Sequence, residues 1–307
     1  MLLHQSSGKW RLGLALSLLT VLLWGVLPIA LKVTLQGLDP YTVTWFRFLM
    51  SFILVGVYLA TRKQLPSREK LRSLPLRLLG VASVFLAFNY ILYLLGLSYT
   101  NPANAQVLIQ LAPVLMGLGG IYIFKERYTL MQWIGLGMLT LGFALFFNEQ
   151  LKTLLTVQGK YLFGSGLIVI AAIVWAIYGL AQKQLLQQLT SANVMLLIYG
   201  ICAVLFAPFA HPESILNLTP LQFCMLIFCG LNTVIAYGAF AESLEHWEAS
   251  RVSAVLSTTP IVTLISVWMV ALLFPTWIVK NNLTFLGVLG ALLVVVGSMT
   301  VALGKKH

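Results

Sequence analysis

Charged side chains are scarce in this sequence. Only 9% of the 307 residues are charged and 60% are hydrophobic, whereas a soluble domain carries about 25% charged residues. The mean hydropathy is +0.93, and apolar runs of about 20 residues, the length that spans a bilayer, recur along the whole chain. These runs are longer and more continuous than the strands of about 10 residues in a membrane β-barrel. The composition therefore excludes an ordinary soluble domain and predicts an all-α polytopic membrane protein.

Acidic residues and histidines are few, and none falls in the middle of an apolar run. A proton-driven transporter usually places a titratable group inside the membrane, so coupling through a mid-membrane carboxylate is not expected. Proton coupling through a carboxylate at the membrane edge, exchange, and facilitated diffusion all stay open. The acids are Asp39, Glu69, Glu126, Glu149, Glu213, Glu242, Glu245 and Glu248, and the histidines are His4, His211, His246 and His307.

The same scarcity argues against an enzyme. An intramembrane metalloprotease needs His or carboxylate ligands, and the sequence has no HExxH stretch. A membrane serine protease needs a base beside its serine, and no histidine is placed for that role. The cysteines Cys202, Cys224 and Cys229 lie in apolar runs without a CxxC pair, so we expect small buried hydrophobes. No catalytic site, metal or cofactor is predicted.

Ten apolar segments follow one another with short connections that leave no room for a soluble domain. We expect each to be a transmembrane helix. Their approximate ranges are 12–33, 41–61, 74–97, 102–124, 130–148, 161–183, 191–210, 219–243, 248–274 and 283–303.

The distribution of positive charge predicts the orientation. The net charge is +11, and the positive-inside bias of membrane proteins explains it more simply than a nucleic-acid partner does. Of the 19 Lys and Arg residues, 14 fall on the side of the N-terminus. Both termini are therefore predicted to be cytoplasmic. The exceptions are Lys32, Lys152, Lys160 and Lys280 on the other side and Arg47 inside a span.

The two halves of the chain contain similar stretches in the same order. "LLWGVLPIALK" resembles "IVWAIYGLAQK", with Trp24 over Trp175, and "NAQVLIQLAPVLMGL" resembles "RVSAVLSTTPIVTLI", with Pro113 over Pro260. Each half holds five predicted spans, and an odd number gives the second half the opposite polarity in the membrane. We therefore predict two inverted five-helix repeats, 1–155 and 156–307, as in many secondary transporters. A third pair, "WIGLGMLTLGFAL" and "FLGVLGALLVVVGSM", places Gly135 and Gly142 over Gly290 and Gly297.

These stretches resemble the drug/metabolite transporter superfamily, in particular its EamA-like exporters. The resemblance is carried by Trp24-Gly25, by Arg47-Phe48, by "LSYTNPANAQVLIQLAPV" and by "FKERYTLMQWIGLGMLTLGFAL", in which Glu126 stands at the family's acidic position. In the second half "LLFPTWIVKNNLTFLG" replaces the acidic turn with a longer loop. The resemblance implies a bacterial inner-membrane protein with ten helices around a central cavity. It also implies export of small metabolites, most plausibly amino acids or similar amphipathic compounds, by alternating access.

The segment 102–124 combines features that are unusual in a membrane span. Gln106 and Gln110 are four residues apart and so share one helix face, and an amide in lipid is costly unless it faces a bundle interior or water. Pro113 removes a backbone donor and kinks a helix. We predict a kinked gate helix whose two amides face substrate. The alternative is hydrogen bonding between helices.

Other embedded polar and aromatic residues predict the same cavity. Asn89 and Tyr93 are four residues apart in one span. Thr233 and Tyr237 are four residues apart in another, with Asn232 adjacent to Thr233. Aromatic walls with a few convergent polar groups suit a small amphipathic ligand, although packing alone also explains buried aromatics. The complete predicted substrate-binding set is Trp24, Asn89, Tyr93, Gln106, Gln110, Trp175, Tyr178, Asn232, Tyr237 and Ser257.

Four residues are assigned gating or structural roles: Pro113, Pro260, Arg47 and Glu126. Arg47 is expected to snorkel to the membrane surface, to pair with Asp39 or to hold the bundle together, with substrate contact a less favoured role. Glu126 is expected to form a turn or a gate ion pair. Phosphorylated substrates need several cations, and the only other candidate is Lys32, so sugar phosphates are disfavoured.

Three classes of function thus stay open. The favoured one is a metabolite exporter whose partners are a small-molecule substrate and the lipid bilayer, working as a monomer or homodimer. A channel-like facilitator or an exchanger of other metabolites is the alternative within transport. A lipid-handling or scaffold protein is the alternative from another class, and it leaves the polar helix faces unexplained.

Overall fold

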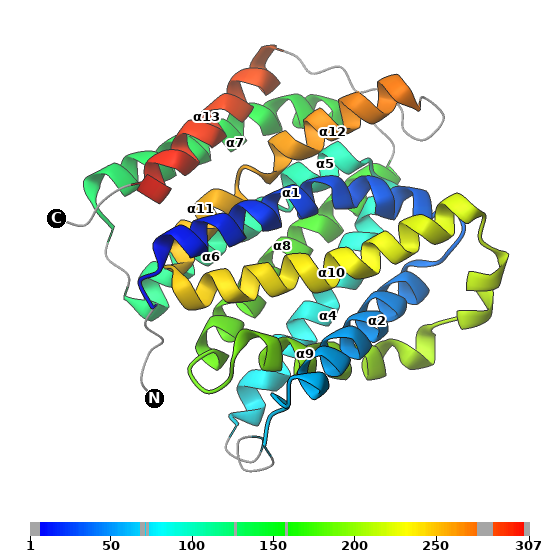
Figure 1. Ribbon diagram of the computed structural model, residues 1–307. Coiled ribbons are helices and arrows are strands. Elements are labelled where there is room, and N and C mark those ends of the chain that lie inside the picture. The colour runs from blue at the N-terminus through cyan, green and yellow to red at the C-terminus, as the bar shows by residue number, and fades with distance from the viewer. Residues whose placement is uncertain are drawn as a thin grey trace.

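The computed structural model describes residues 7–67, 71, 74–125, 128–156, 159–274 and 285–303. Within these ranges all regular elements are helices (Figure 1). The α-helices are α1 (Trp10–Thr34), α2 (Pro40–Thr61), α4 (Leu76–Tyr99), α5 (Pro102–Leu108), α6 (Leu111–Phe124), α7 (Leu130–Thr156), α8 (Gly159–Leu185), α9 (Ser191–Phe206), α10 (Pro220–His246), α11 (Ala249–Leu256), α12 (Thr259–Leu273) and α13 (Phe285–Leu303), and the 3-10 helices are η1 (Ala207–Phe209) and η2 (Pro212–Asn217).

The helices are those of a membrane protein. In the part of the chain that the structure describes, seven helices are long and apolar enough to cross a bilayer, counting Ala249–Leu273 as one. Three shorter apolar helices accompany them, Val114–Phe124, Leu130–Leu145 and Phe285–Gly297. The all-α polytopic class is therefore confirmed, whereas the count of ten spans stays a prediction. The first turn of α1 and the last turn of α13 lie at the same end of the bundle (Figure 1).

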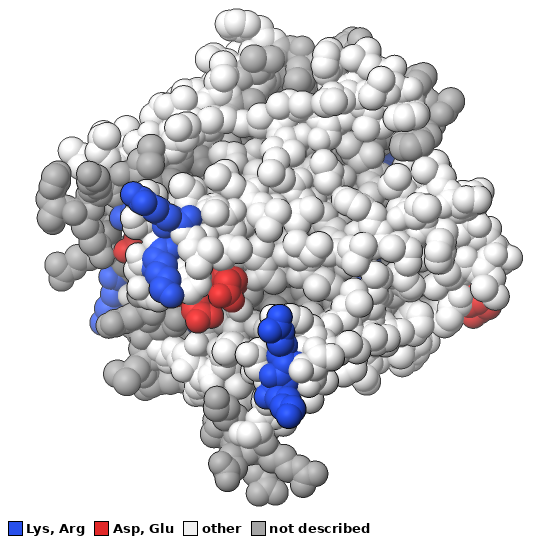
Figure 2. All heavy atoms as spheres, viewed as in Figure 1, with Lys and Arg blue, Asp and Glu red and all other residues white. Residues whose placement is uncertain are grey.

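The outer surface is apolar. Leu22, Phe88 and Ile170 belong to three different helices, and they are 57%, 54% and 48% exposed. In Figure 2 the face in view is white over most of its breadth, and the charged side chains gather towards its ends. A broad apolar belt of this kind is suited to lipid rather than water.

The predicted span 102–124 is a broken helix rather than a kinked one. α5 ends at Leu108 and α6 begins at Leu111, with a turn at Ile109 and Gln110. Proline has no N–H and is tolerated in the first turn of a helix, which is where Pro113 falls in α6. The carbonyl of Ile109, four residues before the proline, accepts instead from the Ala112 N–H at 2.9 Å.

The predicted span 248–274 is broken in the same way. α11 and α12 are separated by Ser257 and Thr258, and Pro260 lies in the first turn of α12. Pro260 has no N–H to donate to the carbonyl four residues before it, which belongs to Leu256. That carbonyl accepts a hydrogen bond from the Thr259 hydroxyl at 2.5 Å. Both helices therefore break beside the repeat-equivalent prolines without leaving these carbonyls unsatisfied.

Helix contacts occur in matched pairs. We let α1 correspond to α8, α2 to α9, α4 to α10, α6 to α12 and α7 to α13. The contact between α4 and α8 then corresponds to the contact between α10 and α1, and the contact between α6 and α8 corresponds to that between α12 and α1. The contacts α2–α9 and α7–α13 map onto themselves. This reciprocity is what two related halves would produce. The boundary between 155 and 156 stays a prediction.

Candidate functional site

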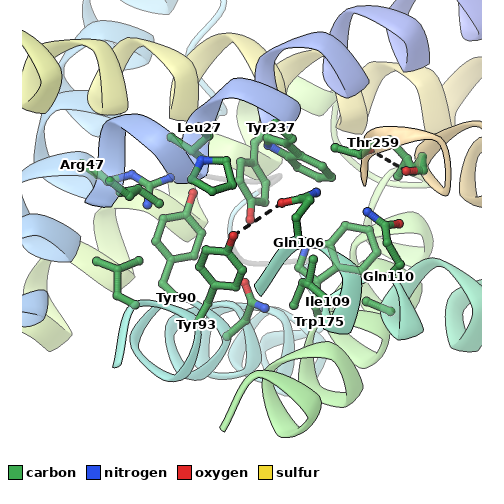
Figure 3. A pocket seen from close by; sticks show the side chains of 17 residues that line it. Leu27, Arg47, Tyr90, Tyr93, Gln106, Ile109, Gln110, Trp175, Tyr237 and Thr259 are labelled. Atoms are coloured by element: carbon green, nitrogen blue, oxygen red, sulfur yellow. Dashed lines mark hydrogen bonds between the residues drawn. The ribbon is translucent and has the colours of Figure 1, made fainter. Parts of the chain in front are cut away.

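A cavity of about 620 Å³, part of it open to solvent, lies in the middle of the bundle (Figure 3). Its wall is built from α1, α2, α4, α8 and α10 together with both broken helices. Ligand pockets are mostly apolar with a few placed polar groups. The lining residues are Trp24, Leu27, Pro28, Leu31, Arg47, Asn89, Tyr90, Tyr93, Leu94, Gln106, Ile109, Gln110, Ala112, Trp175, Tyr237, Leu256 and Thr259.

Most of the predicted substrate-binding residues lie in this wall, and three lie elsewhere. Tyr178 is fully buried in the core. The amide Nδ2 of Asn232 donates to the Leu23 carbonyl at 2.7 Å. The Ser257 hydroxyl donates to the Ser253 carbonyl at 3.0 Å. The cavity wall thus brings together Trp24, Asn89, Tyr93, Gln106, Gln110, Trp175 and Tyr237.

An aromatic cluster forms one wall of the cavity. Trp24 packs against Trp175 with ring centroids 5.7 Å apart and against Tyr237 at 4.8 Å. The residue after Trp24 lets α12 pack closely against α1. A Cβ on Gly25 would come within 2.5 Å of Val262 Cγ1, so only glycine lets α12 approach this closely. The approach also lets the Thr263 hydroxyl donate to the Gly25 carbonyl at 2.7 Å.

Polar groups converge on the same space. Tyr93 OH donates to Gln106 Oε1 at 3.5 Å, and Asn89 Nδ2 donates to the Ala171 carbonyl at 3.0 Å. Gln110 is 2% exposed. Among the described residues, nothing donates a hydrogen bond to its Oε1 or accepts one from Trp24 Nε1. Buried polar groups normally have partners, so these two atoms offer an acceptor and a donor to a ligand.

Arg47 lies at one end of the cavity, buried and 2% exposed. Its Nε donates to Thr233 Oγ1 at 2.9 Å, and its guanidinium carbon lies 4.4 Å from the centroid of the Tyr90 ring. The predicted snorkelling and the pairing with Asp39 are both wrong. Asp39 caps α2 instead, where it accepts from the Tyr41 and Thr42 N–H groups.

Comparison with known proteins identifies the family. The model of the EamA-like transporter family matches the chain twice, over residues 11–148 and 162–303. "Uncharacterized inner membrane transporter YhbE" of Escherichia coli is 40% identical over 296 residues, which cover 96% of this chain and 92% of that protein. The chain belongs to the EamA-like transporter family. The predicted family and membrane location are therefore confirmed.

Two more distant similarities extend the comparison. "Probable amino-acid metabolite efflux pump" of Escherichia coli is 24% identical over 296 residues and 92% of each chain. A solved crystal structure superimposes with a TM-score of 0.70 at 16% identity, over 96% of this chain and 99% of the other. That structural likeness bears only on the fold of this EamA-like protein.

A polar network joins three segments at one end of the bundle. His246, at the end of α10, contacts Glu242 Oε1 through Nε2 at 3.2 Å and Ser7 Oγ through Nδ1 at 2.8 Å. Glu242 also accepts from the hydroxyl of Ser191 at the start of α9. We name Ser7, Ser191, Glu242 and His246 the terminal network. Glu126, the predicted gate residue, lies outside the described residues.

Lys32 lies outside the cavity wall and binds backbone carbonyls at the end of α4. Its Nζ donates to the Leu97 carbonyl at 2.9 Å and to the Thr100 carbonyl at 2.8 Å. These carbonyls lie at the C-terminus of α4, where a cation is favoured by the helix dipole. Arg47 is thus the one Lys or Arg in the wall of the described cavity.

The predicted substrate-binding set leaves out several lining residues, among them Tyr90 and Thr259. Tyr90 follows Asn89 and stands three residues before Tyr93, so helical spacing could have placed it on the same face. Thr259 directly precedes Pro260, and its role in the break gave no signal of its own. The apolar lining residues missed are Leu27, Pro28, Leu31, Leu94, Ile109, Ala112 and Leu256.

Proposed function

We propose that this EamA-like protein exports small amphipathic metabolites across the inner membrane, with amino acids and related compounds as the first class to test. The observation that carries the proposal is the aromatic-walled central cavity, into which the broken helix brings Gln106 and Gln110. Such a wall suits a ligand with an apolar body and a few polar groups. The printed name of the efflux pump that is 24% identical supports the amino-acid class.

Alternating access is the proposed mechanism, and the two breaks are its bend points. Gln110 from the first break and Leu256 and Thr259 around the second all line the same cavity. Rocking of one half against the other around a fixed central site is a common transporter mechanism. Pro113 and Pro260 favour such a role because each keeps its helix from becoming continuous. The matched helix contacts support two related halves.

Counterflow in proteoliposomes tests the proposal. Vesicles are preloaded with one unlabelled amino acid at a time, and uptake of the labelled counterpart is followed with and without a pH gradient. We expect saturable exchange that Gln110→Ala reduces at least about tenfold, because a placed hydrogen bond to a charged ligand group contributes about 1.5–3 kcal/mol. Gln64→Ala is the matched control, since Gln64 is exposed beyond the end of α2.

The outcomes of the counterflow experiment distinguish a carrier from a channel-like facilitator and test the amino-acid class. Flux that does not saturate and shows no counterflow indicates a channel-like facilitator. Loss of uptake in Gln110→Ala with unchanged thermal unfolding places the carrier site in the cavity. If folded wild-type protein exchanges no amino acid, the amino-acid proposal fails and the panel moves to other metabolites and lipids.

A further inference from the structure

We infer that Arg47 is an anion-binding residue of the central cavity and that the cargo is an organic monocarboxylate. The inference rests on the proposed function, because it names the charge class of the substrate for the same cavity. It starts from a buried positive charge that no carboxylate of the described residues neutralises. Arg47 is 2% exposed, and no carboxylate of the described residues lies within 4.0 Å of its guanidinium. A buried charge is costly unless it is paired, so this one is poised for an anion.

The surroundings of Arg47 fix which side of the guanidinium meets the ligand. The Thr233 hydroxyl accepts from Nε at 2.9 Å and itself donates to the Cys229 carbonyl at 2.8 Å, so its proton is committed. The Tyr90 ring lies 4.4 Å below the guanidinium carbon. The Nη groups make no hydrogen bond to any residue that the structure describes. They are the donors that bind a carboxylate in a bidentate manner.

The number of positive charges in the cavity wall favours a cargo with a single negative charge. Arg47 is the one Lys or Arg in the described wall, and Lys32 is held by backbone carbonyls at the end of α4. A phosphate or dicarboxylate would bring a second negative charge with no cation to meet it. The described wall contains no Asp or Glu, so an ammonium group on the cargo would have aromatic faces and amide oxygens as partners.

The shape of the cavity indicates where the rest of the cargo lies. Arg47 and Gln110 are at opposite ends in Figure 3, with Tyr93 and Gln106 between them. Trp24 and the rings around it form an apolar wall along this path. A carboxylate at Arg47 would place the apolar body against these rings, and a hydrogen-bond donor at the far end would reach the unpartnered Gln110 Oε1.

Calorimetric titration of purified wild-type protein tests the inference with matched probes. The probes are 3-phenylpropanoate and 3-phenylpropanamide, which share one body and differ in charge, and the same acid–amide pair with a methyl and an indolyl body. We expect the acid to bind at least about tenfold tighter than its amide for the best body, because charge-assisted hydrogen bonds are about twice as strong as neutral ones. Phenylsuccinate, a dicarboxylate, should bind more weakly than the monoacid.

Two variants assign the effect to the residue. Arg47→Gln should abolish the preference for acid over amide. Arg47→Lys should keep part of the preference, because lysine keeps the positive charge but lacks the planar guanidinium that binds a carboxylate through two N–H groups. Arg62→Gln removes the same charge from the exposed end of α2 and should leave the preference unchanged. If Arg47→Gln does not fold, the acid–amide comparison on wild type still tests the charge class of the cargo, and Arg47→Lys tests the role of the residue.

The failure of this inference is distinguishable from failure of the proposed function. Equal binding of acid and amide, with Arg47→Gln unaffected, overturns the monocarboxylate inference and leaves transport of neutral or cationic metabolites standing. Absence of binding by every acid also overturns it, while counterflow then decides separately whether the cavity carries another class of metabolite.

Discussion

The Trp24 indole packs edge-on against the indole of Trp175, with ring centroids 5.7 Å apart and ring planes at 80°. The two tryptophans occupy equivalent positions in the predicted repeats, one in α1 and the other in α8. Both also line the central cavity. The two predicted repeats would thus meet at the cavity through the same residue type. This is the arrangement expected of a carrier whose halves move around a central cavity.

Replacing Trp24 should weaken substrate binding. Trp24→Leu removes the ring contacts with Trp175 and Tyr237, together with an indole N–H that has no partner among the described residues. Aromatic pairs are worth about 0.5–1.5 kcal/mol beyond their buried area, so we expect the half-saturation concentration in counterflow to rise at least about threefold. Trp268→Leu is the control, because Trp268 is 55% exposed on α12. Equal effects of the two changes would contradict the assignment of Trp24 to the site.

The α7–α13 contact should tolerate no side chain at Gly142. A Cβ there would lie 2.8 Å from the Gly290 carbonyl oxygen, whereas a Cβ on Gly137 of the same helix would meet no atom within 4 Å. Overpacking of this kind costs about 1–3 kcal/mol. Gly142→Ala should therefore lower the midpoint of thermal unfolding in detergent, and Gly137→Ala should not.

The reciprocal change provides an independent check. A Cβ on Gly297 would lie 2.7 Å from the Gly135 carbonyl oxygen, and these residues are the repeat equivalents of Gly142 and Gly290. Gly297→Ala should therefore lower the same midpoint by a similar amount. A large effect in one helix and none in the other would count against two related halves.

Pro260→Ala should slow transport more than it affects stability. The change restores a backbone N–H to the first turn of α12 and lets the helix run through the break at Ser257 and Thr258. Changes at a hinge commonly alter turnover and apparent affinity together, and we expect the initial counterflow rate to fall at least about threefold. Pro220→Ala, in the first turn of α10 and outside the cavity wall, should leave the rate unchanged.

The terminal network should hold the N-terminal segment against α10. His246→Ala removes the contacts to Ser7 and Glu242, each worth about 0.5–1.5 kcal/mol. Amide hydrogen exchange in the segment Ser7–Gly13 should therefore accelerate by about tenfold. His211→Ala is the control, because the His211 side chain is 64% exposed. Unchanged exchange in His246→Ala would contradict a role for the network in fastening this segment.

The positions of the helices could be predicted from the sequence because apolar length alone defines a span. The first expected segment, 12–33, corresponds to α1, and the boundaries differ by a few residues. Which residues of a helix point into the cavity could not be predicted as well. Asn232 and Tyr237 are five residues apart, which places them about 140° apart around a helix of 3.6 residues per turn. Only Tyr237 therefore reaches the cavity, and Asn232 turns to α1.

The surroundings of Arg47 lay beyond sequence reasoning for a different reason. Its hydrogen-bond partner Thr233 is 186 residues away, and no local pattern connects the two. Asp39 looked like a partner because it is near in sequence, but its position directly before α2 makes it an N-cap. Contacts of this kind are set by how helices pack, which composition and spacing do not specify.

Accessibility of a single cysteine at position 110 tests the central claim most directly. Gln110→Cys, made in a background without Cys202, Cys224 and Cys229, is labelled with a membrane-impermeant thiosulfonate from one side of sealed vesicles and then from the other. Ile170→Cys on the lipid-facing side of α8 is the control, since a thiol in lipid is not labelled. The account predicts labelling of position 110 from both sides. It also predicts slower labelling when a transported substrate is present at a concentration high enough to offset the binding lost with the Gln110 amide. Labelling from one side alone, unaffected by any exchanged substrate, would contradict an alternating-access cavity at this site.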